Sequence, residues 1–409
     1  MRHSQPFEPE LVLVRGSRRS FDPSSGAETL SWQAFQERLA LRGKRSQVRK
    51  YRGIELRVRC LDCVHRPLAT AVLLRAISRG RCVMTDDAGR SRRVTLGGMG
   101  RAACRASADR LSAPALLRQT NSELGRVESL YARRAEPRFD PAKRPIYLRT
   151  DLTFGLTAGG SVGHVAGVLN ALDAFTAPPL WLTTDTLPTV REEIEHVLLD
   201  PGCRHWEHVE RIALAANLAY TKQVNSAVAA VDGGLVYLRY GLNNYTGLRV
   251  AAERDLPLVV EFNGSEPWIA REWAGGALRD ETIAQRIESM NLKHADVVVV
   301  VSEPMRATAI ELGAQPDRVL VNPNGVDTQR YRPDVDGAAV RERLGLQGKT
   351  AVGFIGTFDR WHGAPVLVEA VSRLLRDRPA LRETLSCVMI GDGPEFAQVQ
   401  KLLAQHGLE

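Results

Sequence analysis

Residues 295–394 constrain the fold more than any other part of this 409-residue chain. They include five consecutive valines, 297–301, between polar neighbours, and such a continuous apolar run is typical of a strand buried on both faces of a parallel sheet. Ser302 is placed to cap a helix that ends near Leu312, and residues 319–321 form the next expected strand. The order strand, helix, strand predicts an α/β unit with parallel strands.

A second strand, loop and helix pattern follows in the same stretch. Residues 351–356 and 385–390 are expected strands, and a helix with a periodic apolar face is expected over 364–375. Residues 391–394, Gly-Asp-Gly-Pro, then open a further helix. Repeated units of strand, glycine loop and helix present backbone N–H groups and helix N-termini to a phosphate, so these loops are candidate nucleotide sites.

In their order and spacing, these segments resemble the retaining glycosyltransferases of family 4, which have the GT-B fold of two Rossmann-type domains. Two stretches carry the resemblance, VSEPMRATAIELG followed by DRVLVNPNGVDTQRYRP, and VGFIGTFDRWHGAPVLVEAVSRLL followed by VMIGDGP. The resemblance extends over residues 146–409. It implies an α/β, GT-B-like fold with a Rossmann-type N-terminal domain and the first part of a second Rossmann-type domain, preceded by a small α/β accessory region.

Three regions are therefore expected. Residues 1–140 form a basic, small α/β accessory region with a partly disordered start, and a proline-containing linker follows at 136–145. Residues 141–335 correspond to the acceptor-side GT-B domain, and residues 336–409 to an incomplete domain for the nucleotide-sugar donor. Relatives continue through further βα units with a glutamate pair that binds the donor. We therefore expect either a fragment of a longer chain or a truncated protein that does not work alone.

The resemblance assigns donor-binding residues to glycine-containing loops. The donor phosphates are expected at two of these loops, which contain Gly159, Gly160, Ser161, Gly356, Thr357, Arg360 and His362. The nucleotide is expected at the third loop, which consists of Gly391, Asp392, Gly393 and Pro394. A turn between the two domains is expected earlier in the chain, at Asn324 and Gly325. The first loop has a structural alternative, a tight turn that needs positive φ.

The donor loop after residues 351–356 departs from the commonest pattern of the family. Relatives often place an arginine and a lysine on the diphosphate where this chain has Thr357 and His362. Arg360 is expected to supply the missing charge, and His362 to donate to a phosphate oxygen. Trp361 is expected to pack beneath this loop rather than touch the ligand.

No catalytic residue is assigned from the sequence. Many relatives carry a histidine near the end of the strand expected over 257–262, where this chain has Glu261 and Asn263. The candidate acceptor-side residues are His164, Asn263 and Glu266, because ligands of α/β enzymes bind at the carboxyl ends of the strands. His164, expected between a loop at 157–164 and the helix behind it, is equally explained as a surface or capping residue.

The function implied by the resemblance is transfer of a sugar from a nucleotide-diphosphate sugar to a hydroxyl acceptor with retention, in polysaccharide or glycolipid synthesis. No Asp-x-Asp cluster is evident at these loops, so neither a metal nor a cofactor is expected beside the donor substrate. Two alternatives stay open. One is a non-catalytic protein whose basic region binds anions, and the other is a GT-B-fold sugar-nucleotide epimerase.

The positive charge of the chain is concentrated in its first third. Residues 1–140 contain 28 Lys and Arg against 14 Asp and Glu, whereas the rest contains 27 against 33. An arginine-rich region suits anionic lipid headgroups, a lipid-linked pyrophosphate acceptor or, least expected, nucleic acid. The alternative is an ordinary solvated surface in an arginine-rich protein.

The elements expected in this first third are a strand at 55–61, a helix at 67–78, a hairpin at 81–96 that turns at 86–89, and a helix-rich stretch at 101–134. No segment is apolar enough to span a membrane, and the N-terminus lacks the apolar core of a secretory signal. The sequence therefore predicts a cytoplasmic protein, and the resemblance adds peripheral contact with the inner membrane face.

Cys60 and Cys63 form a C-x-x-C pair, and Cys82 and Cys104 follow later in the chain. Four thiolates could hold zinc. The second pair is not closely spaced, however, and free cysteines often pack among apolar neighbours at the end of a strand. The favoured interpretation is packing, with a zinc site as the alternative.

Overall fold

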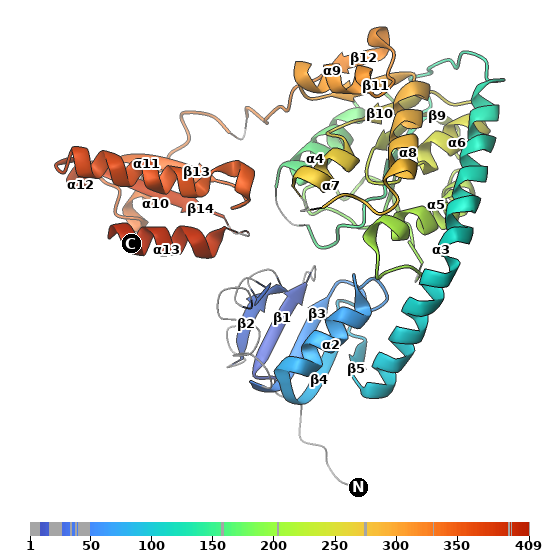
Figure 1. Ribbon diagram of the computed structural model, residues 1–409. Coiled ribbons are helices and arrows are strands. Elements are labelled where there is room, and N and C mark those ends of the chain that lie inside the picture. Colours follow the sequence, from blue (N-terminus) through green and yellow to red (C-terminus); the bar gives the residue numbers. More distant parts are fainter. Residues whose placement is uncertain are drawn as a thin grey trace.

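The computed structural model describes residues 9–15, 27–32, 35, 36, 39, 50–156, 159–202, 204–273, 276–329, 331–391, 393 and 395–408. Within these residues the strands form three separate sheets, of five, seven and two strands (Figure 1). No helix of the described chain combines the length and the apolarity needed to cross a bilayer.

The five-stranded sheet is built by the first third of the chain. Its order is β2-β1-β3-β4-β5, and only the β4–β5 pair is antiparallel. The strands are β1 (Leu11–Arg15), β2 (Glu28–Ser31), β3 (Tyr51–Val58), β4 (Ser78–Asp86) and β5 (Ser91–Arg93). Helix α2 (Pro67–Ile77) buries Leu74 and Ile77 in the core of this sheet. The expected strand, helix and hairpin are confirmed, with Gly89 N donating to Asp86 O at 2.9 Å in the turn.

A single 36-residue helix, α3 (Leu96–Tyr131), replaces the helix-rich stretch expected at 101–134. Thr95 caps it by accepting a hydrogen bond from Gly98 N at 3.0 Å. The helix packs on α2 at one end and on three helices of the seven-stranded sheet at the other. It runs alongside both sheets in Figure 1, and its buried Leu116, Leu124 and Val127 belong to the core of the seven-stranded sheet.

The seven-stranded sheet is parallel throughout, in the order β12-β11-β10-β9-β6-β7-β8. Its strands are β6 (Arg144–Arg149), β7 (Leu180–Thr183), β8 (His196–Leu198), β9 (Gly233–Arg239), β10 (Leu258–Glu261), β11 (Val297–Val300) and β12 (Val319–Val321). Its helices are α4 (Gly160–Leu172), α5 (Val209–Ala227), α6 (Thr246–Arg254), α7 (Glu266–Glu272), α8 (Glu281–His294) and α9 (Glu303–Glu311). The valine run forms the buried strand β11 as predicted, and Ser302 caps α9.

The loop predicted at 157–164 is shorter than expected. Helix α4 begins at Gly160, so Gly160 and Ser161 lie in its first turn rather than in a loop that reaches residue 164. Helix α7 begins at Glu266, because Ser265 accepts a hydrogen bond from Trp268 N at 3.4 Å and caps the helix. The candidate Glu266 therefore lies in the first turn of a helix.

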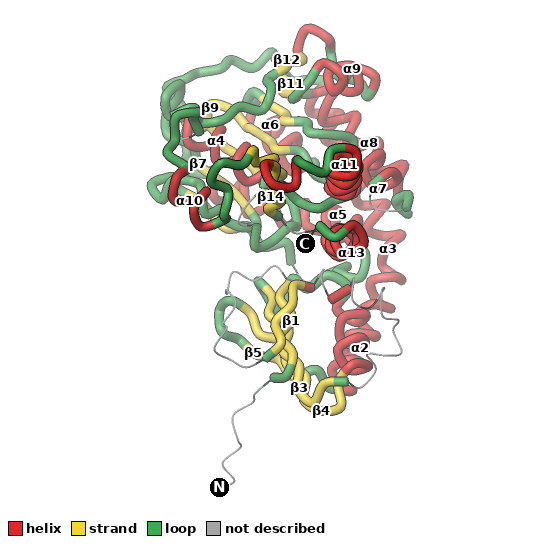
Figure 2. The backbone as a smooth tube through the Cα atoms, turned by 90° about the vertical axis from the view of Figure 1, so that its left-hand side faces the viewer, coloured by secondary structure: helices red, strands yellow, loops and turns green. Residues whose placement is uncertain are grey.

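The two-stranded sheet joins β13 (Thr350–Ile355) and β14 (Leu385–Ile390) in parallel register. The surrounding helices are α10 (Ala338–Arg343), α11 (Ala364–Asp377), α12 (Leu381–Thr384) and α13 (Phe396–His406), with a 3-10 turn at η4 (Arg360–His362). Another 3-10 turn, η3 (Pro316–Arg318), precedes β12 of the seven-stranded sheet. A small core of Phe358, Ala364, Val368 and Val399 holds this unit together. Figure 2 shows it in front of the seven-stranded sheet, at the end of the segment that follows β12.

Candidate active site

A buried carboxylate, Glu261, lies at the carboxyl end of β10 in the middle of the seven-stranded sheet. Arg239, the last residue of the neighbouring β9, forms an ion pair with it. The Tyr237 hydroxyl donates to Glu261 at 3.2 Å, and Asn263 Nδ2 donates at 2.6 Å. Glu261 is 1% exposed, so these partners replace the water that an ionised carboxylate requires.

His164 of α4 is a further partner of Glu261. It follows the glycine loop that precedes α4. Its Nε2 lies 3.2 Å from Glu261 Oε1, and its Nδ1 lies 2.9 Å from Asn324 Oδ1. The close contact with Glu261 raises the pKa of His164 above its ordinary value, although burial opposes the shift. Burial would raise the pKa of Glu261, but the contact with His164 and the charge of Arg239 hold that pKa below its usual range. The arrangement favours an imidazolium that pairs with Glu261 through Nε2 and hydrogen-bonds Asn324 through Nδ1.

At the end of β10 the chain has Glu261 and Asn263 in place of the histidine of many relatives, and the imidazole of His164 contacts Glu261 from α4. His164 is therefore not simply a surface residue, since its side chain is 13% exposed. Asn324, predicted to mark the interdomain turn, is its second partner, whereas Gly325 beside it has open space around its Cα.

The loop that precedes α4 brings a helix N-terminus to the same edge of the sheet. Gly159 has a φ of 117°, a conformation that glycine adopts readily. A tight turn that needs positive φ, the structural alternative for this loop, is therefore present at Gly159. Gly160 and Ser161 are exposed in the first turn of the helix. Thr157 and Ala158 lie outside the described residues.

The predicted donor loops lie against each other in the two-stranded unit. His362 Nδ1 is 2.8 Å from both Oγ1 and the carbonyl oxygen of Thr357, and Gly356 N donates to Ile390 O at 3.0 Å. A Cβ on Gly391 would lie 1.8 Å from Gly356 O, and one on Gly393 would lie 2.6 Å from Phe358 N. Glycine at 391 and 393 thus allows the two loops to touch. Asp392 and Pro394 fall outside the described residues.

Trp361 does not pack beneath its own loop, contrary to expectation. Its ring stacks on Trp273, which follows α7, with centroids 4.7 Å apart and planes at 15°. Trp268 meets the other side of this cluster, edge to face with Trp273 at 5.3 Å. Each of the three rings is nearly half exposed. Arg360 and His362 therefore flank a tryptophan that contacts the acceptor-side region.

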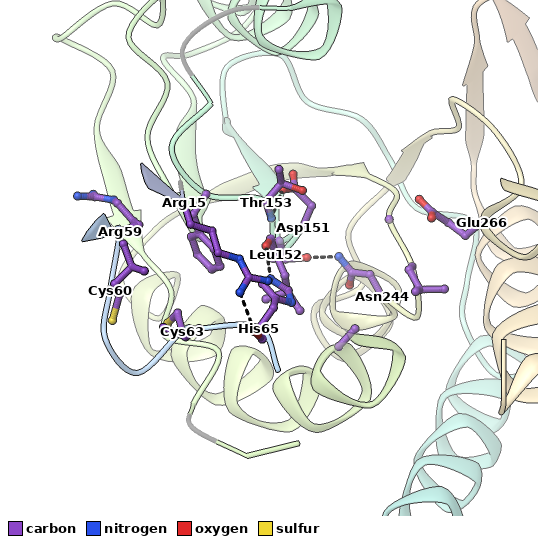
Figure 3. A pocket seen from close by; sticks show the side chains of 17 residues that line it. Arg15, Arg59, Cys60, Cys63, His65, Asp151, Leu152, Thr153, Asn244 and Glu266 are labelled. Carbon is purple, nitrogen blue, oxygen red and sulfur yellow. Dashed lines mark hydrogen bonds between the residues drawn. The ribbon is translucent and has the colours of Figure 1, made fainter. Parts of the chain in front are cut away.

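A pocket of about 450 Å³ lies between the five-stranded and seven-stranded sheets, at the carboxyl ends of strands from both (Figure 3). The five-stranded side contributes Arg15, Val58, Arg59, Cys60, Cys63, Val64 and His65. The opposite side contributes Thr150, Asp151, Leu152, Thr153, Phe154, Ala213, Gly241, Leu242, Asn244 and Glu266. Two lengths of chain that are distant in sequence therefore share one cavity.

Ion pairs fix the two walls of this pocket relative to each other. Arg59 Nε lies 3.1 Å from the buried carboxylate of Asp185, and its Nη1 lies 3.3 Å from Asp87. On the first wall, Arg15 Nη1 donates to His65 O and to Thr70 Oγ1, each at 3.0 Å. Arginine in the first third of the chain thus has structural roles that its net charge alone did not indicate.

Glu266 is the predicted acceptor-side residue that lines this pocket. Burial, followed by the nearby carboxylates of Glu288 and Asp151, raises the pKa of Glu266 to about 7. The other two predicted residues, His164 and Asn263, contact Glu261 instead. The sequence signal for the pocket was the position of residues 63–65 just after the strand predicted at 55–61, where parallel sheets place ligands.

The four cysteines considered for zinc do not assemble. Cys60 and Cys63 lie at the pocket, Cys82 is buried with its Sγ 3.5 Å from Leu74 O, and Cys104 is exposed on α3. Across the part of the chain that the structure describes, no group of three or more His, Cys, Asp or Glu side chains is placed to hold a metal ion.

Comparison with known proteins identifies relatives of the central region. Residues 158–330 match the family described as Glycosyltransferase Family 4. The chain is 30% identical over 259 residues to D-inositol 3-phosphate glycosyltransferase of Thermomonospora curvata, covering 58% of each chain. It is 32% identical over 162 residues to the protein of that name from Kineococcus radiotolerans, covering 39% of this chain and 37% of that one. The matches thus span a third to three fifths of these relatives' lengths.

A solved structure supports the architecture. The crystal structure of a glycosyltransferase from Rickettsia africae ESF-5 superimposes with a TM-score of 0.50 at 18% identity, over 66% of either chain. The expected α/β fold with parallel, Rossmann-like sheets is confirmed. The resemblance to glycosyltransferase family 4 is borne out over residues 158–330, the stretch that matches that family.

Proposed function

We propose that the protein transfers a sugar from a nucleotide-diphosphate sugar to a hydroxyl acceptor, with retention at the anomeric carbon. The observation that carries the proposal is the buried network of His164, Glu261 and Arg239 at the carboxyl edge of a sheet that matches glycosyltransferase family 4. Ligands of open α/β sheets bind at this edge. A positively charged imidazole held there is suited to a substrate whose reaction releases negative charge.

On the donor side, the departing diphosphate needs cationic and N–H partners. We assign this role to the N-terminus of α4, at Gly159, Gly160 and Ser161, and to the loop of Gly356, Thr357, Arg360 and His362. Helix N-termini and cationic side chains stabilise a leaving diphosphate as charge develops on it. The third glycine loop, at residues 391–394, is assigned to the nucleotide. The proposal invokes no cofactor.

On the acceptor side, we assign the pocket between the two sheets to the acceptor. Its polar groups include Thr150 and Asn244, which suit hydroxyl groups, and its apolar wall suits the carbon face of a ring. Glu266 has a pKa of about 7, so near neutral pH it can accept or return a proton of an acceptor hydroxyl. We place this reaction in polysaccharide or glycolipid synthesis at the inner membrane face.

The test uses the full-length protein from its natural source with UDP-, GDP- and ADP-sugars. Release of the nucleoside diphosphate is followed over time, and the anomeric configuration of the transferred or hydrolysed sugar is read by proton NMR before mutarotation. The proposal expects release from one donor class with the α or β configuration of that donor retained. Inversion of the anomeric configuration would reject the proposal. It would also be rejected if no donor released a nucleoside diphosphate with any mixture of acceptors.

The same assay separates the two alternatives. An epimerase would interconvert two nucleotide sugars with no acceptor requirement. A purely anion-binding protein would show affinity that falls steeply with salt and no dependence on the sugar. Within the basic region, Arg59, Arg90 and Arg134 are each paired with carboxylates.

A further inference from the structure

Cys60 and Cys63 lie on the loop between β3 and α2, at the edge of the pocket (Figure 3). Both are partly exposed. Cys63 N donates to Cys60 O at 3.2 Å, so the four residues form a β-turn. In such turns the first and last Cα atoms are closer than about 7 Å, which is the spacing that a disulfide requires.

The surroundings of Cys60 favour its thiolate. Arg90 Nη2 lies 3.6 Å from the Cys60 sulfur. The neighbouring Cys63 thiol is the main cause that lowers the pKa of Cys60 to about 6, against the effects of burial and of Asp62. The Cys60 thiol in turn raises the pKa of Cys63, and burial and the charge of Asp200 act in the same direction.

Arg90 is held in place by its own partners. Its Nη2 lies 2.7 Å from the buried carboxylate of Asp86, and Nη1 lies 3.4 Å from Asp62. Asp62 also pairs with Arg92 at 3.0 Å, so its negative charge is shared between two guanidinium groups. The positive field at the Cys60 sulfur therefore comes from a fixed group, as in sites of reactive cysteines.

We propose that Cys60 and Cys63 form a redox-active dithiol site that reacts with a low-molecular-weight disulfide such as glutathione disulfide. The Cys60 thiolate attacks one sulfur of glutathione disulfide, forming a mixed disulfide and releasing one glutathione thiolate. Cys63 then loses its proton, attacks the Cys60 sulfur and releases the second glutathione. The two protein thiols lose two electrons and two protons, and one glutathione disulfide becomes two glutathione molecules.

Oxidation at this site acts on a wall of the pocket. Arg59, adjacent in sequence to Cys60, connects that wall to Asp185 of the seven-stranded sheet. The Cys60–Cys63 disulfide replaces the two thiols of the turn beside this arginine. The inference goes beyond the proposed transfer reaction, and its chemistry is measured on the protein thiols without any sugar substrate.

The first test measures alkylation of the native full-length protein by iodoacetamide from pH 5 to pH 9, with each cysteine quantified by peptide mass spectrometry. Cys104, exposed on α3, serves as the internal control. We expect the rate at Cys60 to reach half its maximum at a pH at least one unit below the corresponding pH for Cys104. Coincident profiles for the two residues would overturn the proposal.

The second test incubates the protein with glutathione disulfide and maps the products. The wild type is expected to yield an intramolecular Cys60–Cys63 disulfide, recognised by the loss of two hydrogen masses from one peptide. The Cys63→Ser variant keeps a hydroxyl donor and is expected to stop at the mixed disulfide on Cys60. Glutathione that stays on Cys60 of the wild type, or that reacts first at Cys104, would contradict the assigned roles. Circular dichroism establishes that the variant is folded.

Discussion

The seven-stranded sheet and the two-stranded sheet use the same local pattern but bury it to different extents. In β11, Val298 and Val300 are fully buried, whereas Ile355 at the end of β13 is 81% exposed. In the two-stranded sheet, alternate residues divide between a small core and the surface, with Phe354 packed inward and Ile355 outward. The comparison shows that a strand followed by a loop and a helix can form in both units although the strands differ in burial. The charge network of the candidate site lies in the more deeply buried of the two units.

Two ion pairs of equal length make the comparison quantitative. His164 and Glu261 are 3.2 Å apart with side-chain exposures of 13% and 1%. His406 and Glu369 of the two-stranded unit are also 3.2 Å apart, with exposures of 27% and 43%. Distance alone would make these pairs equivalent, whereas burial makes the first pair far more costly to break.

The largest effect is therefore expected from Glu261→Ala. Removing this carboxylate leaves Arg239 and His164 without their buried anion, and we expect the free energy of unfolding to fall by about 3–5 kcal/mol. The matched variant Glu369→Ala should cost less than about 1 kcal/mol. Urea unfolding of the full-length protein measures both. Equal losses in the two variants would show that burial does not distinguish the two units.

The next largest difference in the free energy of unfolding is expected between alanine substitutions of apolar residues in the two sheets. Leu238→Ala, in fully buried β9, should lower the free energy of unfolding by about 2–5 kcal/mol because it leaves a cavity. Ile355→Ala removes a side chain that is already 81% exposed, so it should change stability by less than about 0.5 kcal/mol. Urea denaturation of the two variants provides the measurement. A large loss in Ile355→Ala would mean that β13 is covered in solution.

The pH dependence of the buried pair has a defined sign. The pKa of His164 is raised by its close contact with Glu261, so its contribution is complete below the unfolded value of about 6.5 and is lost as the pH rises through the folded value. The pKa of Glu261 is lowered, so its contribution is present above about 4.3 and is lost as the pH falls through its folded value. The stabilising effect should peak between these limits.

Comparing wild type with His164→Gln across pH 4 to pH 9 isolates this effect. The difference in free energy of unfolding between the two proteins should be largest near pH 5 to 6 and should shrink above neutral pH. A difference that is constant with pH would show that His164 does not carry the charge assigned to it.

The smallest effect concerns the tryptophan stack between the two units. A double-mutant cycle with Trp273→Ala and Trp361→Ala should give a coupling energy of about 0.5–1.5 kcal/mol, the range for stacked aromatic pairs. In the control cycle, the effects of Trp361→Ala and of Trp206→Ala on the free energy of unfolding should be additive, because Trp206 is distant from the stack. Additivity in both cycles would show that the stack contributes nothing to holding the two units together.

Local patterns predicted most strands of the molecule, for physical reasons visible in particular residues. The valine run formed β11 because both faces of that strand are covered, and Ser302 capped α9 because its hydroxyl accepts from Met305 N. Strands β1, β2, β7 and β8 were not predicted. The continuity of α3 was not predicted, because three glycines near its start and Pro114 inside it disfavour a helix that tertiary packing nevertheless maintains.

The candidate site was predictable only in part. Sequence position placed Glu266 at the end of a strand, where it does line a pocket. The meeting of His164 with Glu261 depends on how α4 packs beside β10, and no pattern within either segment encodes it. The wall formed by residues 58–65 likewise depends on the placement of one sheet against another. The donor and nucleotide assignments in the glycine loops stay predictions.

The most direct test of the account compares Glu261→Gln with Glu210→Gln. Both carboxylates are buried, but Glu210 accepts a hydrogen bond from Arg279 N at 2.8 Å rather than pairing with His164 and Arg239. Nucleoside diphosphate release from the preferred nucleotide sugar is measured for both variants of the full-length protein after circular dichroism has shown that they fold. The account predicts that Glu261→Gln lowers kcat at least about tenfold, equivalent to about 1.4 kcal/mol, and that Glu210→Gln changes it by less. Wild-type turnover in Glu261→Gln would contradict the placement of the transfer site at this edge of the sheet.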